Sequence, residues 1–461
     1  MHIISRFLLV TLIFFGASTA GGTDLAEVYQ IALVSDPTLR EANANRLASS
    51  EASPQARAAL LPLITAFYSR GESDSSGSST FQVEDPITGA VQTVTSAFKT
   101  DVSDEIQWRL QLQQPLFRWD RIVGLRQAQK QVAQAEIDYQ AAQQDLMLRV
   151  AEAYFNVLAA HDTLDAELAS KEATKRQLEQ AEKRFEVGLI AITDVLEAQA
   201  AYDLAVATDI GARRLLSTAK ELLREITGEY IDELQRPGKD LPLINPDPAN
   251  ADAWVEQSLK NNLALNSTRL QADVAKDQVR INRSGHMPTL DLVASRTGFD
   301  RDASRSDQGA PFSPADAASN TTSVTLQLNI PIFSGGNTSS IVRQSVYRHR
   351  AAREKVERVA RETERSTRDA YDAVISQIAR VRALRRAVQS NEKALQASEA
   401  GFEVGTRTTV DVLNARQELF RARTDYARTR YNYIVNVLRL KQAAGNLSGR
   451  DISEVNSWLA D

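Results

Sequence analysis

The sequence predicts an α+β membrane protein in which a β-hairpin followed by a very long helical hairpin occurs twice. Three observations predict this class. Two long stretches without proline carry apolar residues at helical spacing, a strand of alternating apolar and polar residues precedes each of them, and both halves match at a nearly constant separation.

Long helices fit residues 116–236 and 332–461, because proline breaks helix interiors and the proline-free runs lie here. Apolar residues in the first run recur with a mean step of about 3.6, the period of a nearly straight helix. A helix over residues 121–187 would extend about 100 Å and would need partner helices along its side. The first apolar stripe comprises Val132, Ala135, Tyr139, Ala142, Leu146, Val150, Ala153, Val157, Ala160, Leu164 and Leu168. The second comprises Val356, Val359, Ala370, Val374, Ile378, Val381, Leu384 and Val388.

Each long helix is expected to end at a glycine turn. The segment RFEVG ends at Gly188 and GFEVG ends at Gly405. A second helix is predicted after each turn, over residues 193–227 and 409–444. Each half of the chain therefore contains a helical hairpin.

The two hairpins are copies of one another. Gly188 and Gly405 are 217 positions apart, and LQLQQPLF at 110–117 matches LQLNIPIF at 326–333 with an offset of 216. The same 217-residue offset relates Asp194 to Asp411, Tyr154 to Tyr371 and Gly228 to Gly445. An internal duplication accounts for these matches, with a first structural repeat over residues 21–240 and a second over 241–461.

Strands are predicted ahead of each helical hairpin, where apolar side chains alternate with Gln, Arg, Thr and Asn. Such alternation is typical of a strand with lipid on one face and water on the other. Partner strands are expected over residues 63–70 and 289–299, and the Ser-, Asp- and Gly-rich segments 71–103 and 300–322 are expected to be solvent loops. The predicted membrane-facing residues are Ile106, Trp108, Leu110, Leu112, Val324, Leu326, Leu328 and Ile330.

Four strands per chain cannot close a membrane barrel, and an open sheet edge is not tolerated in lipid. Closure must then come from several chains. Two chains would give eight strands and a filled interior, whereas three would give twelve strands around a water-filled lumen. The polar side chains predicted to face inward favour the trimer, with the helices continuing the cylinder beyond the membrane as a helical barrel.

The N-terminal residues predict export. Residues 1–20 combine a basic front, a short apolar stretch and a Ser-Thr-Ala cleavage site, and we expect cleavage after Ala20; an uncleaved anchor is the alternative. No later stretch has the roughly 18 to 20 continuous apolar residues of a membrane helix. The mature chain is therefore expected to be soluble or inserted by strands.

The composition excludes several classes of function. Cysteine is absent, which excludes disulfides and cysteine-based metal sites. The formal net charge is −5, which gives no reason to expect nucleic acid as a partner. The four histidines stand in no metal-ligand spacing, and no nucleotide-binding or hydrolase motif occurs. We therefore expect no metal, no cofactor and no enzymatic activity.

The chain resembles the TolC family of outer-membrane efflux ducts over nearly all of its mature length. The resemblance rests on SDPTLR near Ser35, on QPLF and IPIF at the strand ends, on AYFNVL at Ala153 and on RYNYIVNVLRLKQAAG near the end. The two hairpin turns, RFEVGLIAITDVLEAQ and GFEVGTRTTVDVLNARQELF, are the most specific. The second lies close to the founding subgroup, whose members carry no lipid-bearing cysteine.

The resemblance implies a homotrimer in the outer membrane with most of its mass in the periplasm. It implies a twelve-stranded barrel, a helical tunnel that narrows at the periplasmic tip, and a partnership with a periplasmic adaptor (membrane fusion) protein and an inner-membrane transporter. Cargo in the family ranges from drugs and small molecules to secreted proteins, as in efflux pumps and type I secretion systems. The hairpin tips implied to bind the adaptor are Gly188, Leu189, Gly405 and Thr406.

The resemblance also implies a gate. Asp411 matches an aspartate that forms an acidic ring at the constriction, and Arg407 matches an arginine that ties the inner hairpin to its neighbours. The implied partners of this arginine are Thr193, Asp194 and Gln177. Two positions depart from the founding member. Phe402 replaces a tyrosine whose hydroxyl latches the gate, and Asn414 replaces a second aspartate ring, which predicts a latch weaker by one hydrogen bond and a less acidic constriction.

Plainer interpretations remain beside these roles. Asp194 and Asp411 lie near helix starts, where a carboxylate favours the helix dipole, and Arg407 would serve equally as a solvated loop cation. For the whole protein, the alternative is a structural periplasmic coiled-coil scaffold without transport activity.

Overall fold

The computed structural model describes residues 22–238, 241–307, 310–312 and 316–459. The predicted signal peptide lies outside the described residues. The chain divides into two compact units. The helical unit consists of the described residues of Met1–Asn45, Glu136–Ser267 and Glu357–Asp461, and the sheet unit of those of Arg46–Ala135 and Thr268–Val356.

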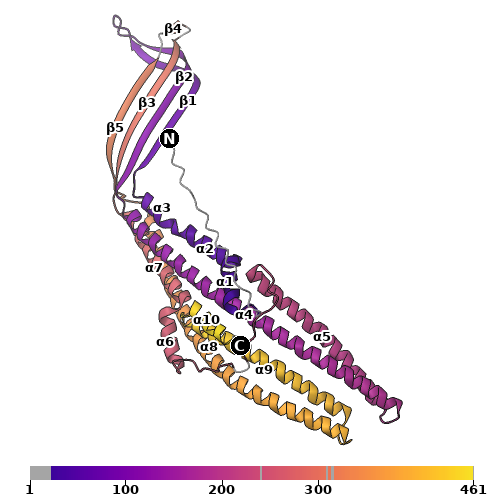
Figure 1. Ribbon diagram of the computed structural model, residues 1–461. Coiled ribbons are helices and arrows are strands. Elements are labelled where there is room, and N and C mark those ends of the chain that lie inside the picture. The colour runs from indigo at the N-terminus through magenta and orange to yellow at the C-terminus, as the bar shows by residue number, and fades with distance from the viewer. Residues whose placement is uncertain (1–21, 239–240, 308–309, 313–315, 460–461) are drawn as a thin grey trace, which may run out of the picture. The chain divides into compact units, whose positions relative to one another are not determined.

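Two pairs of long helices dominate the helical unit (Figure 1). Helix α4 spans Trp119–Glu186 and α5 returns over Ile192–Thr227, while α8 spans Asn337–Glu403 and α9 returns over Thr409–Ala443. These bounds confirm the four predicted helices to within a few residues. None of the predicted stripe residues is exposed, so both stripes face packed surfaces.

Shorter helices lie outside the predicted elements. They are α1 (Leu25–Ser35), α2 (Pro37–Ser50), α3 (Ala52–Ala58), α6 (Ala251–Asn261), α7 (Leu263–Arg283), a 3-10 turn at Ser284–His286, and α10 (Gly449–Ser457). Helices α1 and α10 contact one another through Asn456, whose side chain accepts a hydrogen bond from the Ala26 amide at 3.1 Å and donates one to Asp24 at 3.0 Å. Asp24 itself caps α1 by accepting from the Glu27 amide at 2.7 Å.

The SDPTLR segment owes its structure to Asp36, which is 2% exposed. Its carboxylate accepts from the Leu39 amide at 2.8 Å, which satisfies the start of α2, and it pairs with both Nη atoms of Arg149 at 3.1 and 2.9 Å. Burial acts to raise the pKa of Asp36, but the hydrogen bonds from Arg149 and Leu39 outweigh it and lower the pKa. The charged side chain of Asp36 therefore caps α2 and links it to α4 through Arg149.

The main hydrophobic core lies where α1, α4, α8, α9 and α10 meet within the helical unit. Tyr154 contacts Phe155 edge to face and Phe155 stacks on Tyr431, with ring centroids 5.3 and 5.8 Å apart respectively. Tyr154 also donates to the Gln235 carbonyl at 2.7 Å, which holds the segment after α5 against α4. The hydroxyls of Tyr154 and Tyr431 both have hydrogen-bond partners, as burial requires.

The sheet unit contains an antiparallel sheet of β1 (Leu63–Glu84), β2 (Val91–Phe117), β3 (Thr289–Asp307), β4 (Ala310–Phe312) and β5 (Ala317–Asn329) (Figure 1). Its order is β1-β2-β3-β5, with the short β4 pairing the end of β3. The two predicted β-hairpins thus pair through β2 and β3. β1 and β5 are the edge strands.

The predicted solvent loops are wrong over most of their length. Residues 71–84 and 91–103 belong to β1 and β2, and residues 300–307, 310–312 and 317–322 belong to β3, β4 and β5. Backbone pairing continues through these Ser- and Thr-rich segments, for example between Thr80 and Thr95. Their sequence lacks apolar alternation, so the strand signal disappears although the hydrogen-bonded ladder does not.

The register places the predicted apolar set on one face of the sheet. Leu112 is opposite Ala294, which is opposite Val324, and directly paired residues share a face. Because side chains alternate along a strand, Trp108 and Leu110 share that face with Leu326 and Leu328. Ile330 is an exception, since β5 ends at Asn329. The opposite face carries polar pairs such as Ser295 and Ser323, whose hydroxyls are 2.9 Å apart.

One glycine makes room on the apolar face. Gly298 is paired with Trp108, and a Cβ at position 298 would lie 2.1 Å from Trp108 Nε1. The indole therefore covers the backbone of β3, a close approach that only glycine permits.

Candidate functional site at the helical turns

The two glycine turns have matching geometry. Gly188 and Gly405 adopt φ of 76° and 77°, the left-handed region that favours glycine. Leu189 N donates to the Arg184 carbonyl at 2.9 Å, and Thr406 N donates to the Gly401 carbonyl at 2.8 Å. These bonds close α4 and α8 by the same means. The predicted turn role of both glycines is confirmed.

The turns are open to solvent. Gly188 and Gly405 have no heavy atom within 4 Å of an added Cβ, and Leu189 and Thr406 are exposed. The turn residues therefore leave a surface that the described residues of the chain do not cover.

Asp411 forms a reciprocal cap at the start of α9. Its carboxylate accepts from the amide and the hydroxyl of Thr408, both at 2.9 Å, and the Asp411 amide donates to Thr408 Oγ1 at 3.2 Å. The Thr408 amide, and then its hydroxyl, lower the pKa of Asp411. Asp194 forms a weaker version, accepting from the Ala191 amide at 3.3 Å, because alanine offers no hydroxyl. Helix capping thus describes both aspartates within one chain.

Arg407 stays in its own hairpin in the single chain. Its Nη1 lies 3.9 Å from Asp411 Oδ1, and the Arg407 side chain is 59% exposed. Among the described residues of one chain, it makes no hydrogen bond to Thr193, Asp194 or Gln177. A bond to Thr193 or Asp194 of another protomer stays a prediction.

Gln177 lies away from the turns. It is 7% exposed within α4 and stands 11 residues before Gly188, or about 16 Å along the helix. Its neighbour Leu178 packs with Ala181 and Ala198 in a small core between α4 and α5. The structure therefore does not place Gln177 with the predicted gate residues.

Asn414 lines a groove of about 560 Å³ between α5 and α9. Leu204 and Phe420 supply apolar walls, and Glu197 and Arg421 supply charge. The groove lies between the two hairpins of one chain, so Asn414, three residues after Asp411, faces the other hairpin.

Several ties between helices were not predicted from the sequence. Arg416, with a side chain 18% exposed, pairs with Glu399 at 2.7 Å and donates to the Ala173 carbonyl of α4 at 3.3 Å. Asp209, 3% exposed, binds Lys171 at 2.8 Å, and this bond is the largest cause that lowers the pKa of Asp209. Nothing in the sequence distinguishes Arg416 from nearby exposed arginines, because its burial depends on α4, where Ala173 lies 243 residues earlier in the chain.

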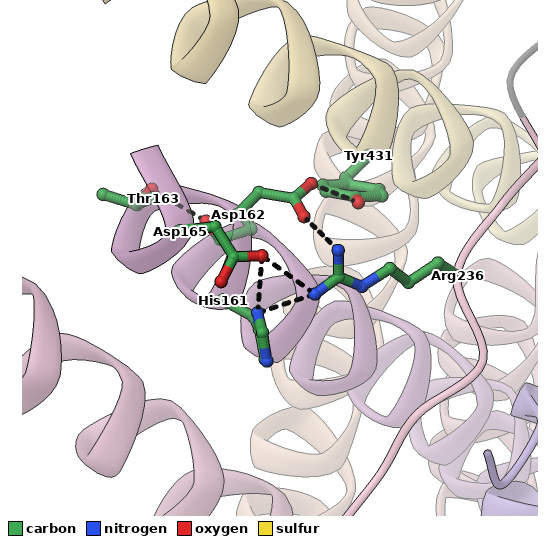
Figure 2. A network of polar contacts seen from close by, with 7 residues as sticks. His161, Asp162, Thr163, Asp165, Arg236 and Tyr431 are labelled. Atoms are coloured by element: carbon green, nitrogen blue, oxygen red, sulfur yellow. Dashed lines mark hydrogen bonds and ion pairs between the residues drawn. The ribbon is translucent and has the colours of Figure 1, made fainter. Parts of the chain in front are cut away.

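A polar network joins α4 and α9 with the segment after α5 (Figure 2). Tyr431 donates to Asp162 at 2.6 Å, and burial is the main cause that raises the tyrosine pKa. Arg236 lies 3.5 Å from Asp162 and 3.1 Å from Asp165, and its Nη2 lies 2.7 Å from His161 Nδ1. Figure 2 shows Arg236 reaching between the two aspartates. One arginine therefore contacts three side chains within about one turn of α4.

The described residues contain no group of three acidic or histidine side chains that could hold a metal ion. None of the described helices is long and apolar enough to cross a membrane. The features that characterise the chain are therefore a sheet with one apolar face and two long helical hairpins with exposed turns.

Comparison with known proteins identifies this class. The model of the outer membrane efflux protein family matches the chain twice, over residues 28–229 and 254–446. The chain is 36% identical to outer membrane protein TolC of Escherichia coli, covering 96% of this chain and 86% of that protein. It is 31% identical to the alkaline protease secretion protein AprF of Pseudomonas aeruginosa, covering 94% and 86%. The solved structure of CusC shares the fold, with a TM-score of 0.73 at 18% identity over 93% of this chain and 95% of that one.

The chain belongs to the outer membrane efflux protein family, within the TolC group. It is an outer-membrane efflux channel and not an enzyme. The alternative of a scaffold without transport activity is therefore wrong. The twofold match of the family model agrees with the predicted duplication, although it does not test the boundaries at residues 21–240 and 241–461.

Proposed function

We propose that three copies of the chain form one duct and that the helical turns are its gate. Members of the TolC family form trimeric channels. The edge strands support closure by other copies, because β1 has 22 residues and β5 has 13, and each lacks a partner on one side within the described chain. An unpaired edge leaves backbone groups unsatisfied, which lipid does not tolerate. Three sheets of four strands would close a twelve-stranded barrel.

The apolar face of the sheet is proposed to contact lipid. Leu110 is 49% exposed in the single chain, and Val324, Leu326 and Leu328 are 59% to 70% exposed. Exposed apolar side chains gathered on one face are costly in water and favourable in a bilayer. The polar face, which includes Arg109 and Gln111, would then line the lumen.

The turns are proposed to bind an adaptor that links the duct to an inner-membrane transporter. Gly188, Leu189, Gly405 and Thr406 are accessible, and their positive-φ glycines keep the turns small. Drugs, small molecules and proteins are all candidate cargo. The name of AprF, a protease secretion protein, supports protein export as one of these uses.

The gate proposal predicts two separable effects in planar bilayers. Arg407→Ser should raise single-channel conductance, because it removes a cation that can bind Thr193 or Asp194 of a neighbouring protomer in the closed state. An exposed pair contributes only about 0 to 1 kcal/mol, but three copies act on one state. Asp411→Ala should lower cation selectivity without closing the pore, since three carboxylates would be lost from one constriction.

A matched variant separates charge from capping. Asp411→Asn removes the charge but keeps an acceptor for the Thr408 amide, so its loss of selectivity should equal that of Asp411→Ala. Because the Thr408 bonds lower the Asp411 pKa, the carboxylate keeps its charge to a lower pH than an ordinary aspartate does. Selectivity should then be lost at a lower pH than the titration of an ordinary aspartate would give. Unchanged conductance in Arg407→Ser together with unchanged selectivity in both Asp411 variants would refute the gate at this position.

A further inference from the structure

An arginine and an aromatic ring connect the tips of the two helical hairpins. Arg184 lies in the last turn of α4, and Phe402 lies in the last turn of α8. The Arg184 Cζ is 4.7 Å from the centroid of the Phe402 ring, within the range of a cation–π contact. Both side chains are half-buried, although most of the surrounding tip residues are exposed. The contact joins helices from different repeats.

The copies of Arg184 and Phe402 in the other repeats do not form the same contact. Phe185 is the copy of Phe402, yet it is 42% exposed. The copy of Arg184 is Gly401, where an added Cβ would lie 2.7 Å from Arg407 Cγ. Position 401 is therefore too close to the Arg407 stem for an arginine of its own.

Each hairpin thus carries one arginine near its tip, at positions that are not copies. Arg407 turns back over Gly401 toward Asp411 in its own hairpin, whereas Arg184 faces the other hairpin. A cation in the last helical turn also favours the helix dipole, but this alone would leave Arg184 free in solvent. Its position over a half-buried ring calls for a second role.

We infer that the Arg184–Phe402 contact is a positioning tie that holds the two hairpin tips of one chain together. The ring face attracts the guanidinium through its quadrupole and needs no hydroxyl. The tie therefore offsets the hydrogen bond that Phe402 cannot make. Phe402 therefore helps to hold the tips together through its ring face, although it lacks the hydroxyl of a tyrosine.

The functional consequence rests on the proposed gate. If separation of the hairpin tips opens the duct, then loss of the tie favours the open state by about two- to fivefold per contact. Three contacts that break together would shift the equilibrium on the order of tenfold to a hundredfold. Phe402→Leu and Arg184→Gln should then raise conductance, and the double variant should equal either single one because both remove the same contact.

The geometry is tested without reference to conductance. The chain has no native cysteine, so spin labels at Val187→Cys and Val404→Cys, exposed residues at matching places in the two turns, report the separation of the tips within one chain. Labelled chains are diluted into unlabelled ones so that distances between chains do not contribute. Phe402→Leu and Arg184→Gln should lengthen and broaden the distance distribution, whereas Phe402→Tyr, which keeps a ring face, should leave it unchanged.

The matched control is Phe185→Leu, which removes the exposed copy of the ring and should change neither distance nor conductance. An unchanged distance in Phe402→Leu would overturn the tie, whatever the conductance does. A lengthened distance with unchanged conductance in Phe402→Leu, Arg184→Gln and Arg407→Ser would preserve the tie and refute the gate at the tips. A raised conductance in Arg407→Ser alone, with unchanged distances, would preserve the gate and refute the tie.

Discussion

Gly405→Trp is expected to reduce export to background while the protein still accumulates in the outer membrane. The turn at Gly405 has open space around it, and an added Cβ would have no other heavy atom within 4 Å. The left-handed backbone, with φ of 77°, costs a non-glycine residue about 1 to 2 kcal/mol, which a long packed hairpin tolerates. A bulky side chain on the turn would instead block the proposed adaptor. Export assays with membrane fractionation measure both outcomes.

Two controls separate docking from strain at this turn. Gly405→Ala introduces the same backbone strain with little bulk and should retain most export. Gly89→Trp places the same bulk at another open positive-φ glycine, in the turn between β1 and β2, and should also retain export. Normal export by Gly405→Trp would argue against docking there, and equal losses in Gly405→Ala would assign the effect to the backbone.

Gly445→Ala is expected to destabilise the helical unit far more than Gly228→Ala, although the two glycines are copies. Both follow a helix at positive φ, 74° for Gly445 and 79° for Gly228. A Cβ at position 445 would lie 2.4 Å from the Asn261 carbonyl oxygen, whereas at position 228 the nearest atom is Ser35 Cβ at 3.7 Å. The backbone strain is common to both, and only Gly445→Ala also forces α6 away from the end of α9.

Thermal unfolding in detergent, followed by helical circular dichroism, compares these two variants directly. Gly228→Ala should cost about 1 to 2 kcal/mol, the strain of a left-handed alanine. Gly445→Ala should cost several kcal/mol more or prevent folding, because backbone atoms cannot move aside as a flexible side chain can. Equal midpoints would show that Asn261 does not pack as closely as described.

The long helices could be predicted because their signal is periodic and repeated. Leu146, Val150 and Val157 recur at helical spacing and are 0% to 4% exposed in the structure. The turns could be predicted because a glycine that ends a helix readily adopts the left-handed conformation, which depends only on the local sequence. The outer parts of β1 and β2 could not, since residues such as Thr80 and Thr95 pair through backbone groups that any sequence supplies.

The contacts between hairpins could not be predicted, since they depend on how distant helices pack. Arg416 reaches the Ala173 carbonyl, and Arg184 reaches the Phe402 ring, across more than 200 residues of sequence. The resemblance suggested Gln177 as a gate residue, but its place inside α4 separates it from the turns. The resemblance could therefore suggest residues for the gate, but it could not identify the contact between Arg184 and Phe402 that joins the hairpin tips in this chain.

The mass of the detergent-solubilised native assembly tests the central claim most directly. Native mass spectrometry, together with circular dichroism of the same sample, measures the number of chains and the strand content. The proposed duct predicts three chains, because only further copies can satisfy the open edges of β1 and β5. A stable monomer that keeps its full strand content would contradict the closed duct and the gate proposed at its tip.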